Sequence, residues 1–209
     1  MKILEVKSLV FSEVKTIRFG RFPDERGFFT ETYKHSDFQN MPELSFVKDV
    51  SFLQTNVSYS KKNVIRGLHF QHSPIQGKLI RTMVGHMIDL FLDIRIGSPH
   101  FGQIAAQDMP GEPDQDYDQW IWIPPGFAHG FVALKETYIE YFCTAEYGPR
   151  GEAAISPFAS DINWSMCDPQ LKAVVDSIIT DNPIISDKDK NAHTLSSWKA
   201  DPDSNKFTF

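Results

Sequence analysis

The run from His86 to Ile96 constrains the fold of this chain more than any other segment. Every second residue from Ile88 to Ile96 is isoleucine or leucine, so one face of an extended strand is wholly apolar. The opposite face mixes apolar with charged residues, namely Met87, Asp89, Phe91, Asp93 and Arg95. A turn signal, Gly97-Ser98-Pro99, ends the run. This alternation predicts a β-strand, and by spacing alone Asp89 points either into a cavity or into water.

Further short β-type runs, separated by turn signals, fill the chain between residues 26 and 165. The candidate strands are Phe46–Val50, Gln54–Tyr59, Ile65–Gln71, Lys78–Val84, Gln103–Gln107, Trp120–Ile123, Gly130–Ala133 and Tyr138–Thr144. Many short strands at close spacing are typical of an antiparallel sandwich or barrel, whereas alternating βαβ units would place longer helical segments between them. The pattern therefore predicts an all-β fold.

Helical signals are few, and most of them lie towards the C-terminus. Residues 36–39 can start a short helix, and Asp168-Pro169 reads as an N-cap followed by proline, for a helix through about Ile179. Residues 108–118 form an acidic stretch without periodicity, which predicts a loop. A chain of 209 residues fits a single domain, 1–209, with a core at about 20–165 and a helical extension at about 166–209.

Composition excludes several classes of partner. A net charge of −6 and a pI of about 5.6 disfavour nucleic acid or an anionic membrane surface as the main partner, although a local basic pocket for phosphates stays compatible. No run of about 18 apolar residues is present, so no membrane span is expected. Cys143 and Cys167 are the two cysteines, which provides no disulfide framework. We expect a cytoplasmic protein.

Three local clusters place cationic side chains or histidines beside glycine in otherwise apolar strands. They are Arg66-Gly-Leu-His69-Phe-Gln71, Gln76-Gly-Lys78-Leu-Ile-Arg81 and Ile123-Pro-Pro-Gly-Phe-Ala-His129-Gly-Phe131. A single histidine on such a strand is more often a hydrogen-bonded core residue than a functional one. Several buried cations together, however, are costly without an anionic partner, so the clusters indicate a site for an anionic ligand.

The spacing Pro124-x-Gly126-x-x-His129 matches the second half of the cupin motif, and cupins are double-sheet jelly rolls. The first half of that motif would supply His-x-His and a glutamate to a metal ion. The corresponding strand here reads His69-Phe70-Gln71-His72, without that pattern. A metal site is therefore poorly supported, and we expect a cupin-type barrel with no metal and no cofactor.

With these motifs in order, the chain resembles the dTDP-4-dehydrorhamnose 3,5-epimerases and related nucleotide-sugar epimerases. The matching segments span about residues 20–190 and are Arg26-Gly-Phe-Phe29-Thr-Glu31, Gln54-Thr-Asn56, Arg66 to Gln71, Gln76-Gly-Lys78-Leu, Ser98-Pro-His-Phe-Gly102 and Trp122 to Phe131. The resemblance implies a cupin-type jelly-roll barrel with a few short peripheral helices, mainly C-terminal. It also implies an isomerase whose substrate is a nucleotide-linked 4-keto-6-deoxy sugar.

The implied chemistry removes a proton next to the C4 ketone and returns a proton on the opposite face, at C3, C5 or both. His69 matches the general base, a role that suits a group titrating near neutral pH. Asp189 matches the carboxylate that orients it, although Ser186-x-x-Asp189 also fits a helix-capping box. Lys78 matches the cation that stabilises the enolate, while a surface lysine is the plainer interpretation.

Other residues match substrate contacts of the family. Arg66 matches a pyrophosphate contact, and His129 matches a second active-site histidine that Asp89 would orient. Simple alternation places Arg66 and His69 on opposite faces, so a bulge at Gly67 is required. The resemblance further implies a homodimer in which an N-terminal strand enters the partner's pocket. The remaining implied substrate-binding residues are Gln54, Asn56, Tyr138 and, on the exchanged strand, Arg26, Phe29 and Glu31.

The general acid of the family is a tyrosine, and its position is ambiguous here. Counting without a gap from His129 gives Phe142, which cannot donate a proton. Tyr141 is adjacent, but it faces the other way unless the strand register slips by one residue. Three possibilities stay open, which are a slip that restores Tyr141, reprotonation by water or another group, and partial loss of the double epimerisation. The stretch Met166–Ile184, which is longer than the family's usual connection, is a second departure.

Three alternatives to an epimerase remain at this point. A 3,4-ketoisomerase would use the same barrel and the same class of substrate. A sugar-nucleotide binding protein without catalysis would explain Phe142. A metal-dependent cupin oxygenase is the least supported. The sequence does not identify the nucleotide base or the final glycan.

Overall fold

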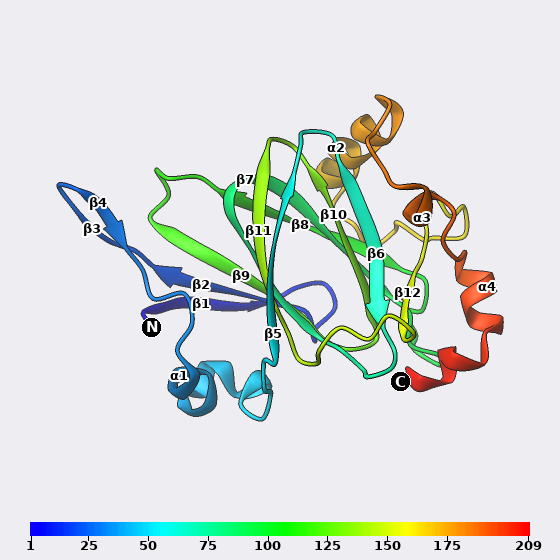
Figure 1. Ribbon diagram of the computed structural model, residues 1–209, viewed down its shortest axis with the longest axis horizontal. Helices are drawn as coiled ribbons and strands as arrows, with labels where there is room; N and C mark the ends of the chain where they lie inside the picture. Colours follow the sequence, from blue (N-terminus) through cyan, green and yellow to red (C-terminus); the bar gives the residue numbers. More distant parts are fainter.

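The computed structural model describes residues 1–209 and folds most of the chain into two packed layers of antiparallel strands. The long strand β7 (Lys78–Asp93) runs through both layers (Figure 1). Its first residues pair with β9 and β11 in one layer, and its later residues pair with β8 and β10 in the other. The predicted all-β jelly-roll barrel is thereby confirmed.

Each layer is completed by strands from distant parts of the chain. The first layer contains β1 (Ile3–Ser8), β2 (Lys15–Gly20), β5 (Gln54–Ser60), β9 (Tyr117–Ile123) and β11 (Thr137–Cys143). The second layer contains β6 (Ile65–Gln71), β8 (Ile104–Gly111), β10 (Phe127–Ala133) and β12 (Glu152–Ala154). A separate hairpin of β3 (Phe22–Asp24) and β4 (Gly27–Phe29) extends beyond both layers.

Short helices cover the outside of the barrel. They are α1 (His35–Asn40), the 3-10 helix η1 (Pro42–Val47), α2 (Pro169–Thr180), α3 (Asp187–Lys190), α4 (Leu195–Ala200) and the 3-10 helix η2 (Pro202–Lys206). Helix α2 begins as predicted, because the Asp168 carboxylate accepts from the amides of Gln170 and Leu171 and Pro169 follows. None of these helices combines the length and the apolar character needed to cross a lipid bilayer.

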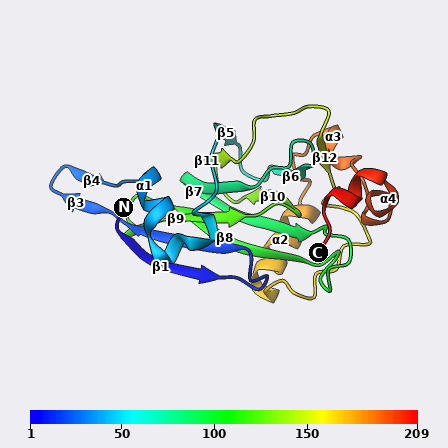
Figure 2. The same cartoon turned by 90° about the horizontal axis from the view of Figure 1, so that it is seen from below.

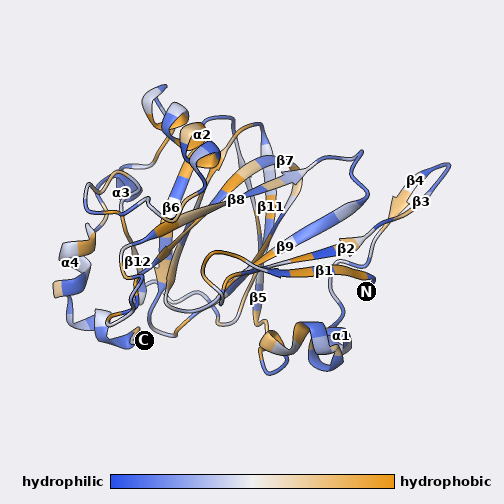
Figure 3. Ribbon diagram, turned by 180° about the vertical axis from the view of Figure 1, so that it is seen from behind, coloured by the Kyte–Doolittle hydropathy of each residue, from blue (hydrophilic) through white to orange (hydrophobic).

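Three apolar clusters hold the layers and helices together. One fills the space between the two layers and includes Phe11, Phe91 and Phe131. A second lies between the outer face of the second layer and the C-terminal helices, with Leu90 and Trp198 in it. The third packs α1 and η1 against the tryptophans of β9. Colouring by hydropathy shows apolar and polar residues interleaved along the strands (Figure 3), as expected where one face of a strand is buried and the other is more polar.

Several predictions about local structure were wrong or incomplete. Residues Phe46–Val50, predicted as a strand, lie in and after η1, because Pro42 opens a helical turn and Leu44 and Val47 share one buried face. The predicted strands at 78–84 and 86–96 lie in one continuous strand that bends at Gly85, where φ is +99°, but this strand ends at Asp93, so residues 94–96 fall outside it. The predicted acidic loop is shorter, since β8 and β9 take up its two ends. Strands β1 and β2 were not predicted at all.

Candidate active site

A cavity of about 390 Å³ lies between the two layers, lined by side chains from β5, β6, β7, β10, β11 and β12. All three cationic clusters of the sequence contribute to its wall, through Arg66 and His69, through Lys78 and through His129. The jelly-roll topology brings these segments together because β6, β7 and β10 are neighbours in the second layer. The cavity is therefore the candidate active site.

His69 and Asp189 form a hydrogen-bonded pair at the cavity wall. The Nε2 atom of His69 lies 2.7 Å from Oδ1 of Asp189, and Oδ2 of Asp189 accepts from the amide of Gly67 at 3.1 Å. Ser186 caps α3 by accepting from the amide of Asp189. The Ser186-x-x-Asp189 pattern therefore serves both the helix cap and the His–Asp pair. The Ser186 hydroxyl caps α3, while the Asp189 carboxylate binds His69.

Burial alone would raise the pKa of Asp189, but the hydrogen bonds from His69, Gly67 and Ser186 hold it below its ordinary value. Asp189 is thus a carboxylate at neutral pH. A carboxylate bonded to one ring nitrogen fixes the orientation of the imidazole and stabilises its protonated form. His69 is therefore equipped to accept a proton from a ligand in the cavity.

Gly67 resolves the conflict between the faces of Arg66 and His69. In the pairing of β10 with β6, His129 lies opposite His69 and Phe131 lies opposite Arg66. The two pairs are two residues apart in β10 but three residues apart in β6. The extra residue in β6 is a bulge, which Gly67 permits with a φ of +102°. The side chains of Arg66 and His69 consequently line the same cavity. This agrees with the sequence analysis, in which a bulge at Gly67 was required.

Lys78 supplies a partly buried cation to the same wall. Its Nζ atom lies 3.4 Å from the carbonyl oxygen of His69. Burial lowers the pKa of Lys78, although the nearby acidic groups Cys143, Glu152 and Asp89 act in the opposite direction. A cation held in a water-poor wall is suited to stabilising an oxyanion that develops on a bound ketone.

A second His–Asp pair lies beside the first. His129 Nε2 is 2.7 Å from Oδ2 of Asp89, and Asp89 is completely buried. Burial raises the pKa of this carboxyl group, while His129 and Lys78 act against that rise. The other oxygen, Oδ1, has no hydrogen-bond partner. Asp89 therefore points into the barrel interior and holds His129.

The alternation of β11 decides the position of the tyrosine. Ile139, Tyr141 and Cys143 line the cavity, whereas Tyr138 and Phe142 do not. The irregular pairing with β7 leaves Met83 of β7 without a partner in β11 and does not change this alternation. Burial raises the pKa of Tyr141, so the phenol keeps its proton at neutral pH.

The prediction of Phe142 as the residue in the acid position is contradicted by the same alternation. Its ring packs outside the cavity against Tyr33, Phe52 and Trp120, with centroid distances of 5.2, 5.8 and 5.1 Å. Tyr138 is likewise outside, since it stacks on Tyr59 at 4.9 Å on the outer face of the layer.

Gln54 and Asn56 of β5 line the cavity, as does Arg66. The Nε atom of Arg66 donates to the hydroxyl of Ser60 at 2.9 Å, and Nη2 donates to the carbonyl of Tyr59 at 3.2 Å. These contacts hold the guanidinium of Arg66 at the wall, with other donors free for an anionic ligand.

Arg26, Phe29 and Glu31 do not reach this cavity. The β3–β4 hairpin carries them out at the end of the molecule opposite α3 and α4 (Figures 1 and 2). The Arg26 side chain is 84% exposed and Phe29 is 66% exposed. Within one chain these three residues are therefore separate from the site.

Sequence reasoning assigned no role in the site to several residues of the cavity, among them Cys143, Tyr147 and Glu152. The carboxylate of Glu152 lies 2.6 Å from Nζ of Lys188 and accepts from the Tyr147 hydroxyl at 3.2 Å. Burial would raise the pKa of Glu152, but Lys188 and His69 bring it below the ordinary value. The only signal was an acidic residue at the start of the short apolar segment 153–155, which is too weak to identify a site.

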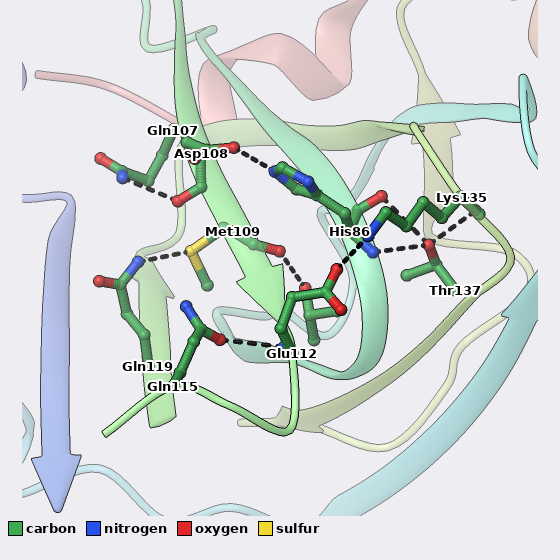
Figure 4. Close-up of polar contacts among 10 residues, drawn as sticks. His86, Gln107, Asp108, Met109, Glu112, Gln115, Gln119, Lys135 and Thr137 are labelled. Carbon is green, nitrogen blue, oxygen red and sulfur yellow. Dashed lines mark hydrogen bonds and ion pairs between the residues drawn. The ribbon is translucent and has the colours of Figure 1, made fainter. Parts of the chain in front are cut away.

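A third His–Asp pair lies elsewhere. His86 Nε2 is 2.5 Å from Oδ1 of Asp108, beside the contacts of Lys135 with Glu112 (Figure 4). Neither His86 nor Asp108 lines the cavity, so this pair is structural.

No three His, Cys, Asp or Glu side chains converge so that they could hold a metal ion. The cavity instead gathers a carboxylate-paired histidine, a partly buried lysine and a protonated tyrosine. Such a set can remove a proton next to a carbonyl, stabilise the enolate and return a proton. Fold and site together define a cupin-type barrel arranged for acid–base chemistry on a carbonyl compound.

Comparisons with known proteins specify this class. A family model described as dTDP-4-dehydrorhamnose 3,5-epimerase matches residues 8–197, and the chain belongs to that family. The dTDP-4-dehydrorhamnose 3,5-epimerase of Salmonella typhimurium is 44% identical over 158 residues, which are 73% of this chain and 81% of that protein. The Pseudomonas aeruginosa protein of the same name is 40% identical over 171 residues, 81% and 83% of the two chains.

A solved structure agrees with these relatives. The dTDP-6-deoxy-D-glucose-3,5-epimerase of Legionella pneumophila Philadelphia 1, in complex with dTDP-4-keto-L-rhamnose, superposes with a TM-score of 0.76 at 32% identity. The match covers 92% of this chain and 93% of that one. The family expected from the sequence motifs is confirmed.

Proposed function

We propose that this chain epimerises a dTDP-linked 4-keto-6-deoxy sugar at C3 and C5. The observation that carries the proposal is the meeting of His69, Lys78 and Tyr141 at one cavity, each held by its own strand. The named relatives act on a substrate of this class, and the Legionella structure binds a dTDP-linked keto sugar. The same chemistry serves deoxysugar biosynthesis for rhamnose-like units.

The residues divide the reaction between them. His69 removes the proton next to the C4 ketone, and Asp189 stabilises the imidazolium that results. Lys78 stabilises the oxygen of the enolate. Tyr141, which keeps its proton because burial raises its pKa, returns a proton to the opposite face. Arg66 and His129 bind the anionic and polar parts of the substrate.

The place of Tyr141 favours an epimerase over the alternatives. A binding protein without catalysis was considered because Phe142 stood where a tyrosine was expected, and Tyr141 now occupies the cavity wall. A 3,4-ketoisomerase would share the base and the lysine, so product analysis separates it from the epimerase. A metal-dependent oxygenase has no group of ligands to support it.

The test follows solvent deuterium into the sugar. The wild-type protein is incubated in deuterated water with dTDP-4-keto-6-deoxyglucose, and the sugar is analysed by NMR and mass spectrometry. We expect deuterium at both C3 and C5 with inverted configuration. Deuterium at C3 alone would assign a single-centre epimerase, and movement of the ketone to C3 would assign the ketoisomerase. No deuterium in the sugar would overturn the proposal.

We further propose a homodimer in which each β3–β4 hairpin enters the cavity of the other subunit. The hairpin supports this because it leaves its own barrel with Phe28 and Phe29 exposed. Isolated two-stranded hairpins are unstable in water. The outer face of the first layer is also apolar where nothing of this chain covers it, at Val57, Tyr59, Val84 and Tyr138.

A mixing experiment tests the exchange. A subunit with Arg26→Ala has an intact cavity but a defective hairpin. A subunit with His69→Asn has a defective cavity but an intact hairpin. After unfolding and refolding together, half of the dimers are mixed, and each should hold one intact site. Activity should then recover to about a quarter of the wild-type value. Activity that stays at the average of the two separate variants would contradict the exchange.

A further inference from the structure

A short segment at the cavity rim is held by glutamine side chains rather than by a strand ladder. Residues 145–148, the rim segment, follow β11 and lie outside every strand and helix. Gln76 Nε2 donates to the carbonyl of Ala145 at 2.7 Å. Gln54 Oε1 accepts from the amide of Tyr147 at 2.8 Å. Backbone groups without a ladder partner need such bonds when they are shielded from water.

Gln71 makes the most complete set of these contacts and is only 2% exposed. Its Nε2 atom donates to the carbonyls of Pro74 at 2.8 Å and Glu146 at 3.0 Å. Its Oε1 atom accepts from the amide of Gly148 at 2.8 Å. Every polar atom of the amide is thus in use, and two of the three bonds require a donor. A carboxylate or an apolar side chain of the same size cannot replace them.

The rim segment carries Tyr147, which lines the cavity and is 56% exposed. Its hydroxyl reaches Glu152, which is tied to Lys188. Lys78, by contrast, is only partly exposed and lies on β7 in the wall of the cavity. A substrate whose sugar reaches Lys78 must extend its nucleotide end towards the mouth. Tyr147 therefore meets the part of the ligand that does not react.

We propose that Gln71, supported by Gln54 and Gln76, is a positioning residue that holds Tyr147 at the mouth for binding of the nucleotide end. The inference rests on the proposed function, because that function sets which end of the ligand lies at the mouth. Gln71 takes no part in proton transfer. Its amide orders the rim segment before the ligand arrives, which reduces the entropy lost on binding.

Steady-state kinetics separate this role from a general structural one. Gln71→Glu keeps the size of the side chain but cannot donate to the two carbonyls, and Gln71→Met removes all polar contacts. Both should raise KM about tenfold and leave kcat within about twofold. Gln119→Met is the matched control, since Gln119 is a buried amide bonded to Arg18 outside the cavity. A fall in kcat at constant KM would overturn the inference.

A double-mutant cycle on ligand binding shows whether Gln71 acts through Tyr147. The affinity for dTDP is measured by calorimetry for the wild type, Gln71→Met, Tyr147→Ala and the double variant. We expect Gln71→Met to weaken binding about tenfold in the wild-type background and less than about twofold in the Tyr147→Ala background. Equal effects in both backgrounds would overturn the inference. If Gln71→Met fails to fold, Gln76→Met enters the same cycle.

The binding assay also keeps this inference separate from the proposed function. A wild-type protein that binds dTDP but incorporates no deuterium into the sugar overturns the epimerase, while the cycle on dTDP still decides the role of Gln71. A wild-type protein that incorporates deuterium, together with Gln71 variants of unchanged affinity, overturns the positioning role alone. A wild-type protein without affinity for dTDP overturns both.

Discussion

His69 and His86 are both paired with an aspartate, at 2.7 and 2.5 Å, but only His69 lines the cavity. Replacing His69 by Asn removes the base and should lower the rate of deuterium incorporation about 10²–10⁴-fold. His86→Asn removes a similar ion pair from the surface and should leave the rate unchanged. Equal losses in the two variants would mean that the measured effect reflects stability and not proton transfer.

Deprotonation of Lys78 should lower the activity at alkaline pH. Burial lowers its pKa, so the ammonium loses its proton at a lower pH than a free lysine, which titrates at about 10.4. Because the charged form stabilises the enolate, kcat/KM should fall as pH rises through this lowered pKa. Burial raises the pKa of Tyr141, so its shift is in the opposite direction. Lys78→Arg stays charged and should move the alkaline fall to higher pH, and an unmoved profile would exclude Lys78 as its cause.

Tyr141 and Phe142 offer a test of which face of β11 lines the cavity. Tyr141→Phe should lower kcat about 10²–10⁴-fold, because the group that returns the proton is lost. The double variant Tyr141→Phe, Phe142→Tyr keeps the composition but places the hydroxyl among Tyr33, Phe52 and Trp120. It should remain as slow as Tyr141→Phe. Recovery of activity would show that position 142 faces the substrate.

At the scale of the element, β6 can form its bulge because residue 67 is glycine. A Cβ on Gly67 would lie 2.6 Å from the carbonyl oxygen of His129 and 2.7 Å from Cα of Gly130. Gly67→Ala should therefore cost about 2–4 kcal/mol of unfolding free energy and displace His69. Gly97 also has a positive φ, of +87°, but open space around it. Gly97→Ala should cost only about 1 kcal/mol, which chemical denaturation can measure. If both variants lose the same unfolding free energy, the loss comes from the positive φ and not from the close contact of residue 67 with β10.

Strands with clear alternation and helices with clear caps could be predicted from the sequence. Residues 65–71 form β6 with the predicted bounds, and α2 begins at its predicted cap. The prediction for 46–50 failed because its apolar residues also fit a short helical turn, and packing against β9 decided the outcome. The face of β11 that carries Tyr141 was not predictable, since counting from His129 crosses the connection between β10 and β11, whose geometry no local pattern encodes.

At the scale of the whole molecule, Asp161 fastens the C-terminal segment to the barrel. Its carboxylate accepts from the amides of Leu195 and Ser196 and from the Ser196 hydroxyl. Burial alone would raise its pKa, but the hydrogen bonds together leave the pKa below the ordinary value. The stabilisation is therefore present above about pH 4 and lost as pH falls through the lowered pKa.

Asp161→Asn should lower Tm by about 2–4 °C at pH 7. The gap should close as pH falls below about 4, because the wild-type carboxylate is then neutral as well. Thermal unfolding followed by circular dichroism across pH 2.5–7 measures both curves. A gap that stays constant over this range would show that the charge of Asp161 contributes nothing.

The assembly of the cavity marks the limit of sequence reasoning at this scale. Motifs predicted His69, Lys78 and His129, because each lies in a short recognisable pattern. Glu152 and the contacts of Gln71 depend on which loops meet after folding, and no local pattern encodes that. Arg26 and Phe29 were predicted to act in the pocket of a partner subunit, and in their own chain both side chains are exposed and outside the cavity.

The pairing of His69 with Asp189 spans 120 residues. During translation, every residue that lines the cavity is synthesised before Asp189. A polypeptide that ends after α2, through a premature stop codon or a protease cut, would lack the carboxylate that orients its base. We therefore expect a chain that ends before Asp189 to incorporate deuterium into the sugar more slowly than the full chain.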